Sequence, residues 1–277
     1  MNWHNVSLNC FFASFAVALL LECAQFLNRS RALRWGAIGF TAAGLVAQTI
    51  YLLVRSQQHD LPPLLGSTHD WLLVLAWLTV VVVLGIQIWD REVSVGVFVL
   101  PLVLALVATA RFARAIPNPR LESLRHWSLL HASFWVFGIG GVVLALVASL
   151  MYLLQHRRLR DKRLESNGMH LLSLEGLSRA NWWLIMVSVP LLTLGLLSGL
   201  WMSYLAHQSA QPVNLASVDF IAMAGVWLMM AVLCGWMLSS KQATGKVVAW
   251  RTLLACGFLL SVLLIMKLLS QDSVHAG

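Results

Sequence analysis

Eight long apolar runs constrain this chain more than any other feature of its sequence. A helix needs about 20 apolar residues to cross the hydrocarbon core of a bilayer. Strands of a membrane barrel would instead alternate in polarity over about ten residues, whereas these runs are continuous. We therefore predict an all-α polytopic membrane helical bundle, a single domain over residues 1–277, with about eight transmembrane helices. The predicted spans are roughly 6–27, 36–54, 70–89, 94–112, 128–153, 182–205, 218–239 and 249–269.

The composition excludes a soluble protein of this size. Only 11% of the residues are charged, whereas soluble domains carry about 25%. The formal net charge of +8 would suggest nucleic acid in a soluble protein, but in a membrane protein the placement of the charges matters more than their sum. We expect membrane lipid, and no nucleic acid, among the partners.

The basic residues predict which way the chain crosses the membrane. Thirteen of the 19 Lys and Arg lie in or beside the connections that follow the first, third, fifth and seventh spans. The positive-inside rule places these connections in the cytoplasm. We therefore predict a multi-pass protein of the cell inner (cytoplasmic) membrane with both termini on the outer face.

A few polar groups stand out within this apolar background. His131 falls just inside the outer end of the fifth span, where polar side chains are costly and tend to be functional. A neutral imidazole there can serve a metal, a haem iron or a proton path, or simply bond to a neighbouring helix. Asp70 and Asp219 are expected to cap their helices, and Glu22 could snorkel to the inner interface.

Several segments, in order along the chain, resemble the CcsA/HemX-type haem-handling membrane proteins of cytochrome c biogenesis. They cover most of the chain, although each motif is loose. The most specific is LSRANWWLIMVSVPLLTLGLLSGLWMS at 177–203. The others are LPPLLGSTHDWLLVLAWL at 61–78, VGVFVLPLVLAL at 95–106, LLHASFWVFGIGGVVLALVASLMYLLQHRRL at 129–159 and the last span with its tail at 250–277.

The resemblance implies a haem site on the outer face. His131 and His275 match the two outward-facing histidines of the family, which makes them the expected axial ligands of a haem iron. Both would open on one outer cavity, with an apolar wall from residues such as Trp135 and Trp201. The implied cofactor is haem, and the implied partners are a CcsB-like membrane subunit or an apocytochrome c.

The outer connection 111–126 carries four arginines on the side that should be poor in positive charge. Haem propionates are carboxylates, which arginine binds in bidentate fashion. Arg120 and Arg125 are therefore expected to clamp the propionates, unless they serve only as headgroup anchors.

Two departures from the family weaken a role in haem attachment. Synthase members carry a tryptophan-rich segment between the sixth and seventh spans, whereas residues 207–219 contain no Trp. Ser239 stands where their seventh span ends in a histidine. We therefore place the chain nearer the HemX-like branch, as an assembly or haem-binding protein rather than an enzyme.

Two other functions compete with haem handling. A HemX-like regulator or scaffold of haem biosynthesis would use the basic cytoplasmic segment 155–180, which could equally contact anionic lipid. A small-molecule transporter is disfavoured, because the chain shows no inverted repeat, pair of broken helices or buried charge row.

Overall fold

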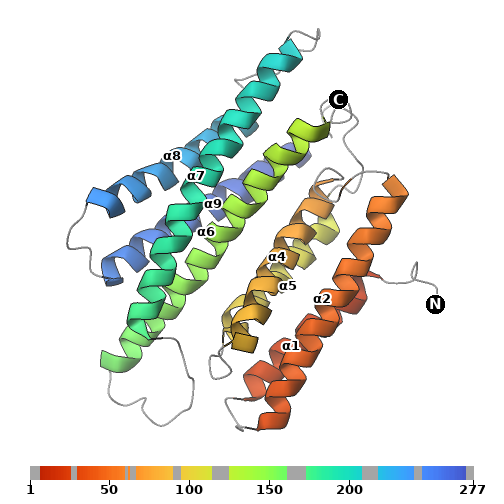
Figure 1. The fold of residues 1–277 in the computed structure, drawn as a ribbon, viewed down its shortest axis with the longest axis vertical. Helices are drawn as coiled ribbons and strands as arrows, with labels where there is room; N and C mark the ends of the chain where they lie inside the picture. The colour runs from red at the N-terminus through yellow and green to blue at the C-terminus, as the bar shows by residue number, and fades with distance from the viewer. Residues whose placement is uncertain are drawn as a thin grey trace. The chain divides into compact units, whose positions relative to one another are not determined.

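The computed structural model describes residues 7–25, 30–59, 62, 67–89, 95–113, 125–160, 173–207, 218–239 and 245–272. Within these ranges all regular structure is helical, which confirms the all-α prediction, and each helix overlaps one predicted span (Figure 1). The helices are α1 (Leu8–Ala24), α2 (Arg31–His59), α4 (Thr68–Trp89), α5 (Gly96–Phe112), α6 (Arg125–Arg160), α7 (Leu174–His207), α8 (Val218–Ser239) and α9 (Gly245–Asp272).

Length and composition qualify four of the described helices to cross a membrane. They are Arg31–Gln58, Thr68–Trp89, His126–Arg160 and Leu174–Leu205. Leu8–Ala24, Gly96–Phe112 and Met223–Ser239 form shorter apolar helices. The protein is thus an integral membrane protein with several candidate spans, while the full count of eight spans and the outward termini stay predictions.

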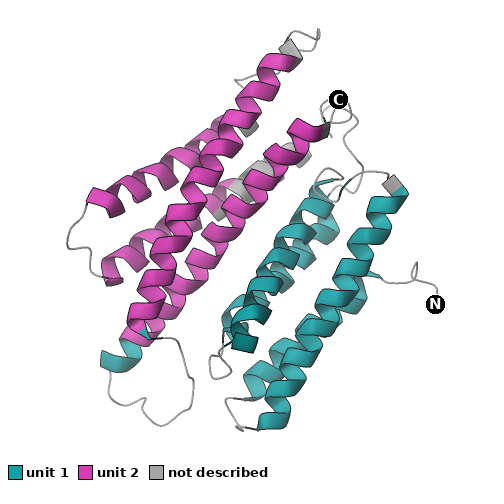
Figure 2. Cartoon of the chain, in the orientation of Figure 1, with its two compact units in different colours: residues 1–125, 157–173 teal, residues 126–156, 174–277 magenta. Residues whose placement is uncertain are grey.

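The chain divides into two compact units (Figure 2). Unit 1 comprises residues 1–125 and 157–173, and unit 2 comprises residues 126–156 and 174–277. Unit 1 therefore holds α1, α2, α4 and α5, and unit 2 holds residues 126–156 of α6 together with α7, α8 and α9. The expectation of a single domain stays a prediction.

Unit 1 is a bundle in which each of the four helices contacts two others. α1 packs on α2 and α5, and α4 packs on the same two helices. Phe11 and Phe15 of α1 are completely buried, and the Phe11 ring lies 5.5 Å from that of Tyr51 on α2. Polar contacts join the helices as well, because Gln48 Nε2 donates to the Leu73 carbonyl at 3.0 Å. The interior of unit 1 therefore combines apolar packing with hydrogen bonds between helices.

Two sequence expectations for unit 1 are wrong in detail. Ser67, rather than Asp70, caps α4, because its Oγ accepts from the Asp70 amide at 3.2 Å and donates to the Asp70 carboxylate at 2.8 Å. Serine is a common N-cap residue, because its hydroxyl satisfies an otherwise unpaired amide of the first helical turn. Glu22 does not snorkel. It is buried and accepts a hydrogen bond from Gln87 Nε2 at 2.7 Å, because an inward-facing amide on α4 offers it a partner.

Unit 2 depends on the close approach of α6 and α7. A Cβ atom at Gly141 would collide with the Ser188 hydroxyl, so a glycine is needed at this crossing. α9 joins the pair through Cys256 Sγ, 3.4 Å from the Val142 carbonyl, and α8 packs on both α7 and α9. This packing holds the first turns of α6 against the last turns of α7, where the candidate site lies.

Candidate functional site

His131 lies in the second turn of α6 and reaches across to α7. Its Nδ1 is 2.9 Å from the Gly195 carbonyl oxygen and 3.0 Å from Ser198 Oγ. Ser198 Oγ itself donates to the Gly195 carbonyl at 2.8 Å. The imidazole is partly exposed. Two neighbouring groups on α7 therefore fix one nitrogen of the ring.

These contacts determine where the imidazole proton sits. A carbonyl oxygen only accepts hydrogen bonds, so the nitrogen facing Gly195 must be the donor. In the neutral ring this leaves Nε2 of His131 unprotonated, with its lone pair available. Among the residues that the structure describes, Nε2 has no hydrogen-bonding partner. Metal-binding histidines typically use this arrangement, with one ring nitrogen tied to a carbonyl and the other on the metal.

The immediate surroundings of His131 hold the ring in place. A Cβ atom at Gly199 would stand 2.9 Å from His131 Cε1, so the absence of a side chain there lets the imidazole rest against α7. Trp135, one turn further along α6, meets the imidazole edge-on with ring centres 6.4 Å apart. Its indole is 4% exposed, and Nε1 has no hydrogen-bonding partner among the described residues. Trp135 therefore forms the inner wall of the site.

An exposed aromatic cluster continues from the same ends of α6 and α7. The ring of Trp127 lies 6.4 Å from that of Trp201, which in turn lies 5.9 Å from that of Tyr204. All three side chains are exposed, between 44% and 59%. An exposed aromatic surface of this kind suits either the membrane interface or a flat aromatic ligand.

The other predicted site residues divide into two groups. Trp135 and Trp201 are described, and both belong to the same ends of α6 and α7 as His131. His275 and Arg120 lie outside the described residues, and of Arg125 only the backbone, at the start of α6, is described. Among the described residues no group of three or more His, Cys, Asp or Glu could hold a metal ion.

Unit 1 contains a polar cluster that the sequence reasoning missed. Arg55 near the end of α2 forms a two-armed ion pair with Asp70 on α4, with N–O distances of 2.6 and 3.1 Å. Next to it, His69 Nδ1 lies 2.7 Å from the Ala110 carbonyl of α5, and Nε2 lies 3.1 Å from the Tyr51 hydroxyl. One signal was available, because Arg55 and Asp70 bracket a single predicted connection with opposite charges.

His69 is a poor metal ligand as it stands. The nitrogen facing the Ala110 carbonyl must donate, so Nε2 accepts from the hydroxyl of Tyr51. Both ring nitrogens are therefore engaged, and the residue is only 6% exposed. The cluster ties α2, α4 and α5 together at one end of unit 1.

Known proteins that resemble the chain include two named relatives. The cytochrome c biogenesis protein CcsA of Gloeobacter violaceus is 26% identical over 165 residues, which are 57% of this chain and 48% of CcsA. Over this match the chain spans about half the length of CcsA. Protein HemX of Brevibacillus brevis is 26% identical over 190 residues, 67% of this chain and 69% of HemX.

No protein-family profile matches the chain, and no solved structure matches it significantly. The chain is therefore a helical membrane protein with distant homology, at 26% identity, to CcsA and to HemX.

Proposed function

We propose that this protein handles haem at the outer face of the inner (cytoplasmic) membrane during cytochrome c biogenesis, with His131 as an axial ligand. One observation carries the proposal: Nδ1 of His131 is tied to the Gly195 carbonyl while Nε2 remains available on a partly exposed ring. The homology to a protein named for cytochrome c biogenesis supports the same function.

The described residues fit one side of a haem. His131 offers an imidazole of fixed tautomer, and the exposed aromatic rings of Trp127 and Trp201 offer flat apolar surface at the same ends of α6 and α7. A bound haem would supply an iron centre that accepts the lone pair of Nε2. Gly195 and Ser198 keep the imidazole in place, and Gly199 leaves room for it.

The remaining parts of the proposed site come from residues outside this geometry. His275 would be the second axial ligand, and Arg120 and Arg125 would hold the propionates. A CcsB-like membrane subunit or an apocytochrome c would receive or present the haem.

The second candidate is a HemX-like regulator or scaffold of haem biosynthesis that transports no haem. It is favoured by the match to HemX, which covers more of both chains than the match to CcsA does. The absence of tryptophan from 207–219 favours it too. Such a protein would act through its basic segment 155–180.

Haem titration separates the two candidates. Protein purified in detergent is mixed with haemin and reduced, and its absorption spectrum is recorded for the unaltered chain, His131→Ala and His126→Ala. His126 lies on the same helix and is exposed, which makes it a matched control. Haem handling predicts a low-spin haem spectrum that is lost only in His131→Ala. A protein that takes up no haemin, or an equal loss in both variants, contradicts the proposal.

The propionate clamp needs its own measurement. Replacing Arg120 and Arg125 together by Gln should weaken haemin binding while leaving expression unchanged, because each bidentate pair with a carboxylate is lost. Unchanged haemin affinity in the double variant would make this connection an interface anchor and nothing more.

A further inference from the structure

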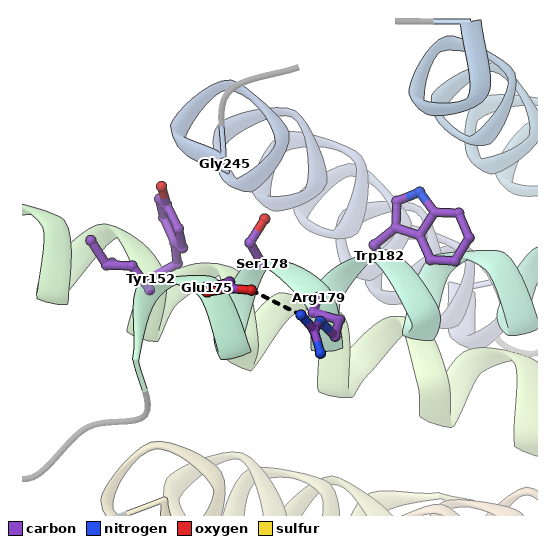
Figure 3. A pocket seen from close by; sticks show the side chains of 7 residues that line it. Tyr152, Glu175, Ser178, Arg179, Trp182 and Gly245 are labelled. Carbon is purple, nitrogen blue, oxygen red and sulfur yellow. Dashed lines mark hydrogen bonds and ion pairs between the residues drawn. The ribbon is translucent and has the colours of Figure 1, made fainter. Parts of the chain in front are cut away.

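Unit 2 has a pocket at the end opposite to His131, where α6 ends and α7 and α9 begin (Figure 3). Its volume is about 460 Å³. It is lined by Tyr152, Leu174, Glu175, Ser178, Arg179, Trp182 and Gly245. The charge pattern predicts that this end faces the cytoplasm.

The polar groups of the pocket are mostly hydrogen-bond donors. The Tyr152 hydroxyl lies close to the first residue of α9, because a Cβ atom at Gly245 would be 2.5 Å from it. Neither this hydroxyl nor that of Ser178 makes a hydrogen bond within the described part of the chain. The first residues of two long helices, Leu174 of α7 and Gly245 of α9, also line the pocket. Helix N-termini carry unpaired amide groups and a partial positive charge.

The charged groups near the pocket also favour a negatively charged ligand. Arg179 forms an ion pair with Glu175 at 2.8 Å, and both side chains are strongly exposed, at 71% and 82%. An exposed pair of this kind stabilises little, so a stronger anion can replace the carboxylate. Lys246 adds positive charge at the start of α9, and Glu175 is the one described acidic group on these helix ends.

We propose that this pocket binds a phosphate-bearing anion, supplied either by the headgroup of an anionic phospholipid or by a soluble phosphate compound. Arg179, the hydroxyls of Ser178 and Tyr152 and the two helix N-termini provide the donors that a phosphate requires. Trp182, 37% exposed and packed at a right angle to Trp183, provides apolar surface beside them, as a lipid at the membrane interface would need.

The test measures retention of phosphatidylglycerol by the detergent-purified full-length chain, with phosphatidylcholine as the reference lipid and native mass spectrometry as the readout. Arg179→Gln should reduce retention about five- to tenfold, because it removes the charged donor. Arg251→Gln is the matched control. It removes the same charge on the neighbouring helix, where Arg251 lies 3.8 Å from the ring centre of Trp236 and does not line the pocket.

Glu175→Gln tests the sign of the ligand charge. It removes the carboxylate that competes for Arg179, so retention of phosphatidylglycerol should rise about two- to threefold. Equal losses in Arg179→Gln and Arg251→Gln would indicate diffuse surface charge and overturn the proposal. Weaker retention in Glu175→Gln would also overturn it, because it would mean that the Glu175 carboxylate contributes to binding instead of competing with the phosphate for Arg179.

Competition identifies the source of the phosphate. Glycerol 3-phosphate is added at millimolar concentration to the lipid-bound protein. If it displaces phosphatidylglycerol from the unaltered chain, a soluble phosphate compound occupies the pocket. If phosphatidylglycerol stays bound and only Arg179→Gln releases it, the occupant is the lipid. No phosphatidylglycerol retained above phosphatidylcholine, together with no binding of glycerol 3-phosphate, overturns the proposal.

Discussion

His69 in unit 1 and His131 in unit 2 share the same kind of contact at Nδ1 but differ at Nε2. Each lies in the first two turns of its helix, and each directs Nδ1 to a backbone carbonyl of a neighbouring helix, at 2.7 and 2.9 Å. In His69 the second nitrogen accepts from Tyr51, and the ring is buried. In His131 the second nitrogen is available and the ring is partly exposed. The second nitrogen, and not the presence of a histidine, separates the structural residue His69 from the proposed ligand His131.

The same contrast extends to the surroundings of each histidine. His69 belongs to a network with the Arg55–Asp70 ion pair, in which every buried polar group has a partner, and such networks hold helices in one arrangement. His131 lies beside Trp135, whose indole nitrogen has no partner among the described residues, and exposed aromatic rings lie at the same helix ends. The polar cluster around His69 therefore holds helices together, whereas the surroundings of His131 leave polar atoms available to the proposed ligand.

The largest expected effect is on the ion pair of unit 1. Asp70→Asn leaves the side chain of Arg55, 17% exposed, without its counter-charge. Breaking one partner of a buried pair costs about 3 kcal/mol of unfolding free energy. Thermal unfolding in detergent should show a clear loss of stability. Glu175→Gln, which breaks an exposed pair, is the control and should change the unfolding free energy by about 0.5 kcal/mol or less. Equal effects would contradict the distinction between the two pairs.

The next prediction compares the replacement of each histidine by alanine. His131→Ala should lower haemin affinity by about tenfold or more, since the proposed axial ligand is lost, and should cost about 1 kcal/mol of stability or less. His69→Ala should leave haemin affinity unchanged and cost about 2 kcal/mol, because two buried hydrogen bonds are lost. Haemin titration and thermal unfolding are measured on both variants. A haemin defect in His69→Ala would show that the two sites are not separate in function.

The sequence predicts the helices better than it predicts their polar contacts. α8 begins and ends where the apolar run 218–239 does, because hydrophobicity and length are local properties. The partner of Glu22 is Gln87, 65 residues away, and the partner of His131 is a backbone carbonyl. Every residue has a backbone carbonyl, so the residue type does not show which one will accept a hydrogen bond. Contacts between side chains far apart in the sequence depend on how the helices pack. His131 itself could be singled out, since a lone imidazole in an apolar span is unusual.

A smaller effect is expected from the space around His131. Gly199→Ala places a Cβ atom 2.9 Å from His131 Cε1, so the imidazole must shift. We expect haemin affinity to fall about three- to tenfold, as for other changes that disturb a ligand's orientation. Gly225→Ala on α8 meets no atom within 4 Å and is the matched control. Unchanged haemin affinity in both variants would mean that the orientation of the His131 ring does not matter for binding.

The smallest effect is expected from Ser198→Ala. The hydroxyl is one of two acceptors for the Nδ1–H of His131, and the Gly195 carbonyl remains when it is removed. Losing one of two shared hydrogen bonds should therefore lower haemin affinity only about two- to threefold. The spectrum of the reduced haem should shift slightly, because a weaker hydrogen bond at Nδ1 makes Nε2 a weaker donor to iron. Ser133→Ala is the control on α6, since its hydroxyl donates to the Leu129 carbonyl of its own helix, at 2.7 Å, and to no other described residue. If Ser198→Ala abolishes haemin binding, Ser198 rather than Gly195 fixes the imidazole. If neither affinity nor spectrum differs from the Ser133→Ala control, the carbonyl alone holds the ring.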